Sequence, residues 1–220
     1  MGTFTGVGNF FGRPLDEVAA ELGYSQDNIL ILQGNEEELR RRYPRIYQNI
    51  LSCQHQADQR TPIEYAQDLV AAWLMEDHFF FQELASDCYR LSKNGADRRR
   101  QILPNTRVSS SSDFVVERDR NRVTLELMNN YTDYWRRTGQ LHLRDRKYDD
   151  LKDSRSLLLA VAVLTREFVI FDFRREIPAE FIPSHKGYGW KPAYALAIPP
   201  ELFRPMADRG IEKAILEALG

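Results

Sequence analysis

The chain contains 220 residues, and its 30 Lys and Arg residues nearly balance its 32 Asp and Glu residues, which gives a formal net charge of −2. This balance excludes a histone-like polycation, and a hydrophobic content of 43% argues against a disordered chain. The charge is nevertheless segregated, because residues 1–89 carry a net charge of −8 and residues 90–147 carry +7. Residues 90–147, which we call the central block, are therefore predicted to contact an anion such as a phosphate backbone.

The distribution of apolar residues and cysteines predicts a cytoplasmic protein without a membrane partner. The longest apolar run, Leu157–Leu164, is far shorter than the ~20 residues that a membrane-spanning helix needs. The N-terminal residues lack the basic-then-apolar order of a secretory signal. Cys53 and Cys88 have no CxxC spacing and lie within helical patterns, which is typical of reduced thiols.

Helical patterns dominate the first part of the chain. Residues 14–23 predict a short helix, and a second helical segment after residue 35 is interrupted by Pro44. Thr61 and Glu64 have the spacing of a capping box at the start of a long helix, which we expect to run to about residue 85. The predicted organisation is a helical N-terminal elaboration (residues 1–60) on a core (residues 61–220), together forming one compact domain.

Beyond Asn94 the apolar pattern changes to a period of two, which predicts strands. Asp113–Glu117 and Arg122–Met128 are joined by a polar turn and predict a hairpin, and a helix is expected through Lys147. The remaining predicted segments are strands at Leu157–Leu164, Phe168–Phe173 and Ala193–Ile198, a loop over residues 178–192 and a helix at Ile211–Leu219. This order of elements indicates an α/β or α+β fold.

Glu76 places a carboxylate within the apolar face of the long predicted helix. Leu69, Trp73 and Phe80 share this face with it. A buried carboxylate requires a partner or a bound cation. Two interpretations follow: Glu76 belongs to a functional site, or it forms a salt bridge with an arginine of the central block.

Asp113 and Glu126 lie on neighbouring strands of the predicted hairpin, near the same end. Asp113 opens the first strand, and strand alternation places Glu126 on the face opposite to the valine and leucine side chains of the second. Two carboxylates this close repel each other unless a cation lies between them. Because Mg²⁺ prefers one or two carboxylates together with water and phosphate oxygens, the arrangement predicts metal-assisted hydrolysis of a phosphodiester.

Three features of the sequence resemble the core of the PD-(D/E)xK nuclease superfamily. They are an acid in a helix, Ser112-Asp113-Phe114-Val115-Val116 at a strand start, and Glu126-Leu127-Met128 on the next strand. Type II restriction endonucleases are members of this superfamily. The resemblance implies a restriction-endonuclease-like αβββαβ core in which Asp113 and Glu126 bind Mg²⁺, with Mn²⁺ as a substitute, and Glu76 assists at the metal. It also implies double-stranded DNA as the substrate and a homodimer with one active site for each strand.

The sequence departs from the family pattern at two positions, because Ser112 occupies the proline position and Met128 the lysine position. The lysine of the family orients water and stabilises the developing charge. Some members supply it from the following helix, where this chain has Lys147, one of only six lysines. Lys147 is therefore the candidate for this role. The alternative is a solvated lysine that pairs with Asp145 or Asp150.

Arginine supplies planar, bidentate donors for phosphates and guanine edges, and 24 of the 30 basic residues are Arg. The basic and amide residues around the hairpin, together with one lysine of a polar aromatic segment, are therefore candidate DNA contacts. They are Arg98, Arg99, Arg100, Arg118, Arg120, Arg122, Asn129, Asn130, Arg136, Arg137 and Lys186. A solvated basic face is the alternative interpretation.

The sequence thus predicts a Mg²⁺-dependent DNA endonuclease, most similar to a type II restriction enzyme. Two other interpretations stay open. The first is a DNA-binding or regulatory protein of the same fold that does not cleave, as Met128 at the lysine position allows. The second is a nuclease that acts on RNA or on DNA under repair.

Overall fold

The structure is a computed structural model that describes residues 9–53, 60–94, 100–104 and 112–220. The chain forms two compact units. We call residues 2–79 with 96–109 the helical unit, and residues 80–95 with 110–220 the sheet unit. The division falls after Phe79, so the long helix expected to open the core belongs to the helical unit.

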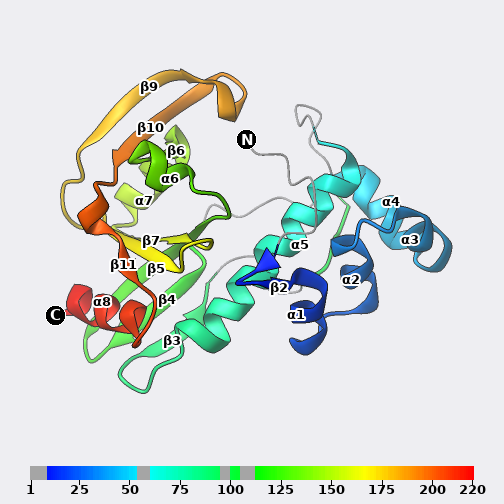
Figure 1. Cartoon of the computed structure of the whole chain (residues 1–220), viewed down its shortest axis with the longest axis horizontal. Coiled ribbons are helices and arrows are strands. Elements are labelled where there is room, and N and C mark those ends of the chain that lie inside the picture. The colour runs from blue at the N-terminus through cyan, green and yellow to red at the C-terminus, as the bar shows by residue number, and fades with distance from the viewer. Residues whose placement is uncertain (1–8, 54–59, 95–99, 105–111) are drawn as a thin grey trace. The chain divides into compact units, whose positions relative to one another are not determined.

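The helical unit consists of a short hairpin and five helices (Figure 1). Its elements are β1 (Asn9–Phe10), β2 (Arg13–Pro14), α1 (Leu15–Glu21), α2 (Gln26–Leu32), α3 (Glu36–Arg42), α4 (Pro44–Cys53) and α5 (Pro62–His78). Pro44 begins α4, because a proline is tolerated in the first turn of a helix, where its missing N–H would have no partner. The capping box is confirmed, since the Thr61 hydroxyl accepts from Glu64 N and the Glu64 carboxylate accepts from Thr61 N. Helix α5 ends at His78 and continues directly into a π-helical turn over Phe79–Glu83, so the helical segment ends close to the predicted boundary at about residue 85.

The sheet unit contains a six-stranded mixed sheet, so the expectation of a mixed α and β fold is confirmed. Its strands lie in the order β11 (Arg204–Pro205), β8 (Glu167–Asp172), β7 (Leu157–Ala162), β5 (Asn121–Asn130), β4 (Phe114–Arg118) and β3 (Arg90–Lys93). All neighbours are antiparallel except β5 and β7, which are parallel. The predicted hairpin is therefore β4 and β5, and its tight turn contains Asp119 in the left-handed region.

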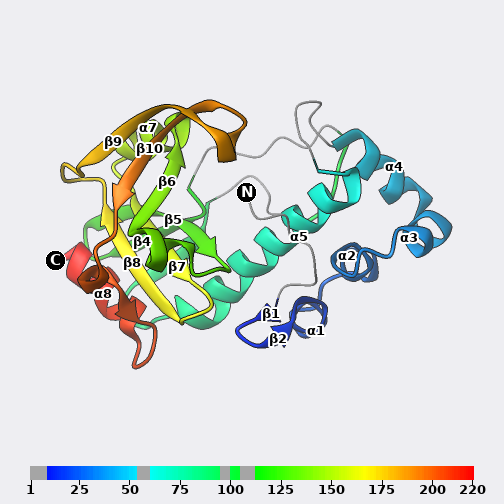
Figure 2. The same ribbon diagram turned by 45° about the horizontal axis from the view of Figure 1, so that its top comes forward.

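A second, three-stranded antiparallel sheet has the order β6, β10, β9 (Figure 2). The elements of this region are α6 (Tyr134–Thr138), β6 (Gln140–Arg144), α7 (Asp145–Asp153), β9 (Ala179–His185), the 3₁₀ turns η2 (Lys186–Tyr188) and η3 (Pro200–Leu202), β10 (Lys191–Ala197) and α8 (Gly210–Leu219). The connection from β5 to the parallel strand β7 runs through α6, β6 and α7, as a parallel pair requires a crossover.

The prediction of a loop over residues 178–192 was wrong, because β9 occupies Ala179–His185 and β10 begins at Lys191. Pro178 and Pro183 suggested a loop, since proline cannot donate to a sheet ladder. Strand β9 is an edge strand, however, and Pro183 lies between its paired residues Ile182 and His185, where the register with β10 shifts. An edge strand with an irregular ladder tolerates proline at such a position.

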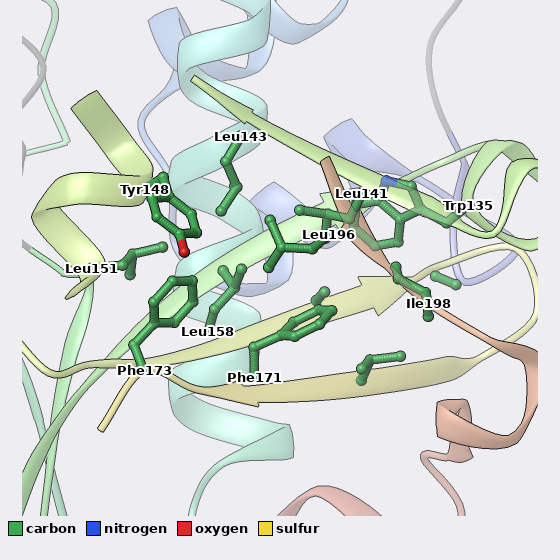
Figure 3. Close-up of a cluster of buried hydrophobic side chains, with 13 residues drawn as sticks. Trp135, Leu141, Leu143, Tyr148, Leu151, Leu158, Phe171, Phe173, Leu196 and Ile198 are labelled. Atoms are coloured by element: carbon green, nitrogen blue, oxygen red, sulfur yellow. The ribbon is translucent and has the colours of Figure 1, made fainter. Parts of the chain in front are cut away.

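The core of the sheet unit lies between the two sheets and α7 (Figure 3). All six residues of β7 are buried, which explains their continuous apolar run, because a central strand is covered on both faces. The cluster comprises Trp135, Leu141, Leu143, Tyr148, Leu151, Leu158, Ala160, Ala162, Val169, Phe171, Phe173, Leu196 and Ile198. It holds α7 against the six-stranded sheet.

Cys53 is buried, Cys88 is exposed, and both are thiols. Among the described residues, no helix combines the length and apolar character that crossing a bilayer requires. The structure thus agrees with the absence of a long apolar run in the sequence.

Leu158 and Leu164 provide a matched test of this core. The Leu158 side chain is fully buried in the cluster, whereas Leu164, in the turn after β7, is 66% exposed. Replacing Leu158 with Ala should lower the free energy of unfolding by about 2–5 kcal/mol, since it removes buried surface and leaves a cavity. Leu164→Ala should change it by less than about 0.5 kcal/mol. Urea denaturation of the full chain measures both, and equal losses would contradict this packing.

Candidate functional site

Asp113 lies one residue before β4, the strand that pairs with β3 on one side and β5 on the other. Its backbone oxygen accepts from Asn94 N at 2.8 Å, and its Oδ2 accepts from Leu127 N at 2.8 Å. The register of β4 with β5 pairs Phe114 with Leu125, so one further step places Asp113 opposite Glu126. Directly opposed residues of an antiparallel pair point to the same face of the sheet. The two residues therefore lie at neighbouring positions on adjacent strands, near the same end of the hairpin, and the Asp113 carboxylate turns to the β5 backbone at Leu127 N.

Glu126 lies in the middle of β5, between β4 and β7, and its side chain is only 10% exposed. Its partner on β7 is Leu158, a member of the core cluster, so the face on which Glu126 lies is the face that α7 covers. Lys147, in the first turn of α7, places its Nζ 2.5 Å from Glu126 Oε1. The lysine therefore neutralises a carboxylate that would otherwise be costly to bury.

The sequence left two environments open for Lys147, one near the acids of the hairpin and one paired with an acid of its own helix. Its described ion pair is with Glu126, not with Asp145 or Asp150 of its own helix. The side chain of Lys147 remains 30% exposed, so its ammonium lies at the boundary between the buried carboxylate and solvent. Within the sheet unit, Lys147 thus contacts Glu126, and Asp113 lies at the neighbouring position of the hairpin.

A polar pocket of about 410 Å³ opens beside Lys147, between α7 and the start of β4. It is lined by Asn94, Ser112, Thr124, Lys147, Asp150, Leu151, Asp153 and Ser154. The buried hydroxyl of Ser156 links three others, at 3.1 Å from Ser112, 2.6 Å from Thr124 and 2.6 Å from Ser154. This hydroxyl cluster was not predicted from the sequence, because isolated hydroxyl side chains carry no spacing signal of their own.

Glu76 lies in the helical unit, where its carboxylate binds Arg100 Nη1 at 2.8 Å. Arg100 also binds Asp77 at 2.7 Å, and Asp77 accepts a further bond of 2.6 Å from the Tyr24 hydroxyl. Burial and the bond to Asp77 raise the pKa of Tyr24, so it stays a protonated donor. The described contact of Glu76 is the salt bridge to a central-block arginine that the sequence left open. Arg100, a predicted DNA contact, is largely buried in this cluster.

The other predicted DNA contacts are dispersed. Arg118, Arg120 and Arg122 surround the hairpin turn of β4 and β5, at the opposite end of β4 from Asp113, and Arg118 and Arg122 lie within 4.0 Å of acidic neighbours. Arg98 and Arg99 lie outside the described residues. Arg118, Arg120 and Arg122 therefore do not lie beside Asp113 and Glu126.

The candidate contacts that follow β5 differ in what they bind. Arg136 is held by Glu167, and Arg137 is exposed beside Asp133 at 3.8 Å. Asn130 accepts from the backbone and hydroxyl of Thr132, whereas Asn129 is half-buried at the end of β5. Lys186 is exposed in η2.

The donor chemistry at Asp113 and Glu126 fits a hard divalent cation. The described residues contain no group of three or more histidine, cysteine or acidic side chains that holds a metal by itself. Mg²⁺ does not require one, since it is commonly bound by one or two carboxylates and completes its shell with water and phosphate oxygens. The two opposed carboxylates supply that number of ligands.

The chain matches no protein-family model, no curated protein and no solved structure.

Arg100 gives a stability test in the helical unit. Replacing it with Ala should lower the free energy of unfolding by about 3–5 kcal/mol, because Asp77 is buried and loses its guanidinium partner. Arg13→Ala is the control, since its pair with Glu21 is exposed and its loss should leave the stability nearly unchanged. Chemical denaturation measures both variants. A loss at Arg100 no larger than that at Arg13 would contradict the assignment of the cluster as structural.

Proposed function

We propose that the protein is a Mg²⁺-dependent DNA endonuclease of the PD-(D/E)xK type, with the activity of a type II restriction enzyme. The observation that carries the proposal is the convergence of Asp113, Glu126 and Lys147, in which a lysine of a following helix contacts the acid of the second hairpin strand. A carboxylate pair with an adjacent ammonium suits the hydrolysis of a phosphodiester.

The order of elements supports the same proposal. Along the chain, helix α5 precedes the antiparallel strands β3, β4 and β5, and helix α7 then leads to β7, which is parallel to β5. This is the αβββαβ order that the resemblance implies. It supports a restriction-endonuclease-like core, with α6 and β6 inserted before α7.

The environment of Met128 explains why the lysine is supplied by α7 and not by β5. Met128 lies two residues after Glu126 on β5 and packs against the core cluster. A lysine at this position would have to bury its ammonium against apolar side chains, which is unfavourable. Helix α7 instead brings Lys147 to Glu126 from the solvent side.

The roles of the residues follow from these contacts. Mg²⁺ bound between the carboxylates would polarise the phosphate and lower the pKa of an attacking water. Asp113 is oriented by Leu127 N, and Glu126 is fixed by its central position in the sheet. Lys147 is then free to turn from Glu126 toward the phosphate, where its ammonium stabilises the charge that develops as the new phosphorus–oxygen bond forms and the old one breaks.

A restriction enzyme would also act as a homodimer, since two symmetric copies match a palindromic site and cleave one strand each. Glu76 is not part of the proposed metal site, because its described contact is the salt bridge to Arg100 within the helical unit. The competing function, DNA binding without cleavage, retains the support of Met128 at the family lysine position.

The carboxylates are tested by Asp113→Asn and Glu126→Gln, which keep the shape of each side chain and remove its charge. Both variants should lose Mg²⁺-dependent cleavage of plasmid DNA, and EDTA should abolish cleavage by the unaltered protein. The side-chain amide in Asp113→Asn keeps an acceptor for Leu127 N, so the fold of this variant should persist. Unchanged cleavage by either variant would reject the metal pair, and salt-dependent binding without any cleavage would favour the binding protein.

Lys147 has a matched control on its own helix, because Lys152 is exposed in the last turn of α7. Lys147→Ala should lower the cleavage rate by about 10²–10³-fold while DNA binding persists. Lys152→Ala should cleave normally. Equal activity of the two variants would remove Lys147 from the proposed machinery, and the same assay with RNA and single-stranded DNA identifies the preferred substrate.

A further inference from the structure

The hairpin that joins β9 to β10 ends in an exposed segment rich in aromatic and basic residues, Ser184–Lys191, which we call the tip. Trp190 is 68% exposed, the largest exposed fraction among the exposed large hydrophobic side chains of the described residues. Lys186 and Lys191 on either side of it are also exposed, and the tip contains no acidic residue. A large aromatic side chain in water beside two cations contributes nothing to the core, so stability does not explain it.

The backbone of Trp190 reinforces this point. Its φ of +64° lies in the left-handed region, which is unfavourable for a bulky side chain. The turn is closed by Gly189 N donating to Lys186 O at 3.1 Å and Trp190 N donating to His185 O at 3.0 Å. Unfavourable backbone conformations that the surrounding structure maintains are concentrated at functional positions.

The tip is fixed to β6 by three contacts. The Tyr188 hydroxyl donates to His142 O at 2.6 Å, His185 Nε2 lies 3.1 Å from His142 Nδ1, and the Arg144 guanidinium lies 5.3 Å from the centre of the Tyr188 ring. Burial and the neighbouring His185 lower the pKa of His142, which favours its neutral imidazole. A tip held in this way presents Trp190 with little further loss of entropy on binding.

These contacts also connect the tip to the candidate active site. Strand β6 carries His142 and ends at Arg144, and α7 begins at the next residue and carries Lys147. The tip is therefore anchored beside the element that supplies the proposed catalytic lysine.

We infer that the tip is a DNA-contacting arm, in which Trp190 stacks on a base while Lys186 and Lys191 neutralise phosphates. Stacking suits an exposed aromatic ring because every base has a π-face once it is unstacked from its neighbours, and a segment whose charges are only positive complements the phosphate backbone. The choice of DNA rests on the proposed function. A membrane surface also binds exposed tryptophan and lysine side chains, and the experiment below distinguishes it from DNA.

Tryptophan fluorescence isolates the tip, because Trp73 and Trp135 are buried and Trp190 is not. Titrating the full chain with a DNA oligonucleotide in EDTA should quench the emission, and Trp190→Phe should remove that change while retaining the affinity within a few-fold. Trp190→Ala should weaken binding by about 5–100-fold through lost stacking. The double variant Lys186→Ala/Lys191→Ala should lower the slope of log K against log salt by about 1.4–1.8.

A double variant of two other exposed lysines, Lys152→Ala/Lys213→Ala, is the control and should keep the slope of the unaltered protein. Binding by Trp190→Ala that equals the unaltered protein would overturn the inference. So would a fluorescence change with anionic phospholipid vesicles but not with DNA. If the tip variants weaken DNA binding while no variant or unaltered protein cleaves DNA, the arm stands and the nuclease proposal fails. If the tip variants cleave DNA normally with an unchanged KM, the nuclease proposal stands and the DNA-contacting arm is rejected.

Discussion

The ion pair between Lys147 and Glu126 is the interaction on which the candidate site depends. It places a lysine from α7 over a carboxylate buried in the middle of the larger sheet, and the apolar cluster around Leu158 holds that helix in place. A buried carboxylate without a partner is destabilising, and the Lys147 ammonium neutralises its charge. Because the lysine side chain is partly exposed, the pair keeps contact with solvent. The same geometry stabilises the fold and leaves a cationic group beside two opposed acids.

The buried acids Asp77 and Glu126 are neutralised in different ways. In the helical unit, Arg100 forms bonds to both Glu76 and Asp77, and this rigid, bidentate arrangement suits a permanent structural role. In the sheet unit, a single ammonium on a flexible stem neutralises Glu126. A lysine in this position can exchange its carboxylate for another anion at little structural cost. This difference explains why we assign function to Glu126 and a structural contact to Glu76.

Much of this arrangement was predictable from local sequence patterns. The capping box at Thr61 and the hairpin of β4 and β5 are signalled by residues close together in sequence, and alternation along β5 correctly separated Glu126 from its apolar neighbours. Long-range features were not predictable in this way. Strand β9 was missed because Pro183 is compatible with an edge strand only when a partner such as β10 is known, and the hydroxyl cluster at Ser156 joins segments far apart in sequence. The sequence suggested only that Lys147 faces the predicted metal site, and its ion pair with Glu126 depends on the packing of α7 against the sheet, which no local pattern signals.

The central claim is that Asp113 and Glu126 together bind a divalent cation. Electron paramagnetic resonance of Mn²⁺, titrated into the full chain with a DNA duplex present, measures this directly and does not depend on turnover. Saturable Mn²⁺ binding is expected for the unaltered protein and should be lost in both Asp113→Asn and Glu126→Gln. Mn²⁺ binding that is equally strong in the unaltered protein and in the two variants would contradict it.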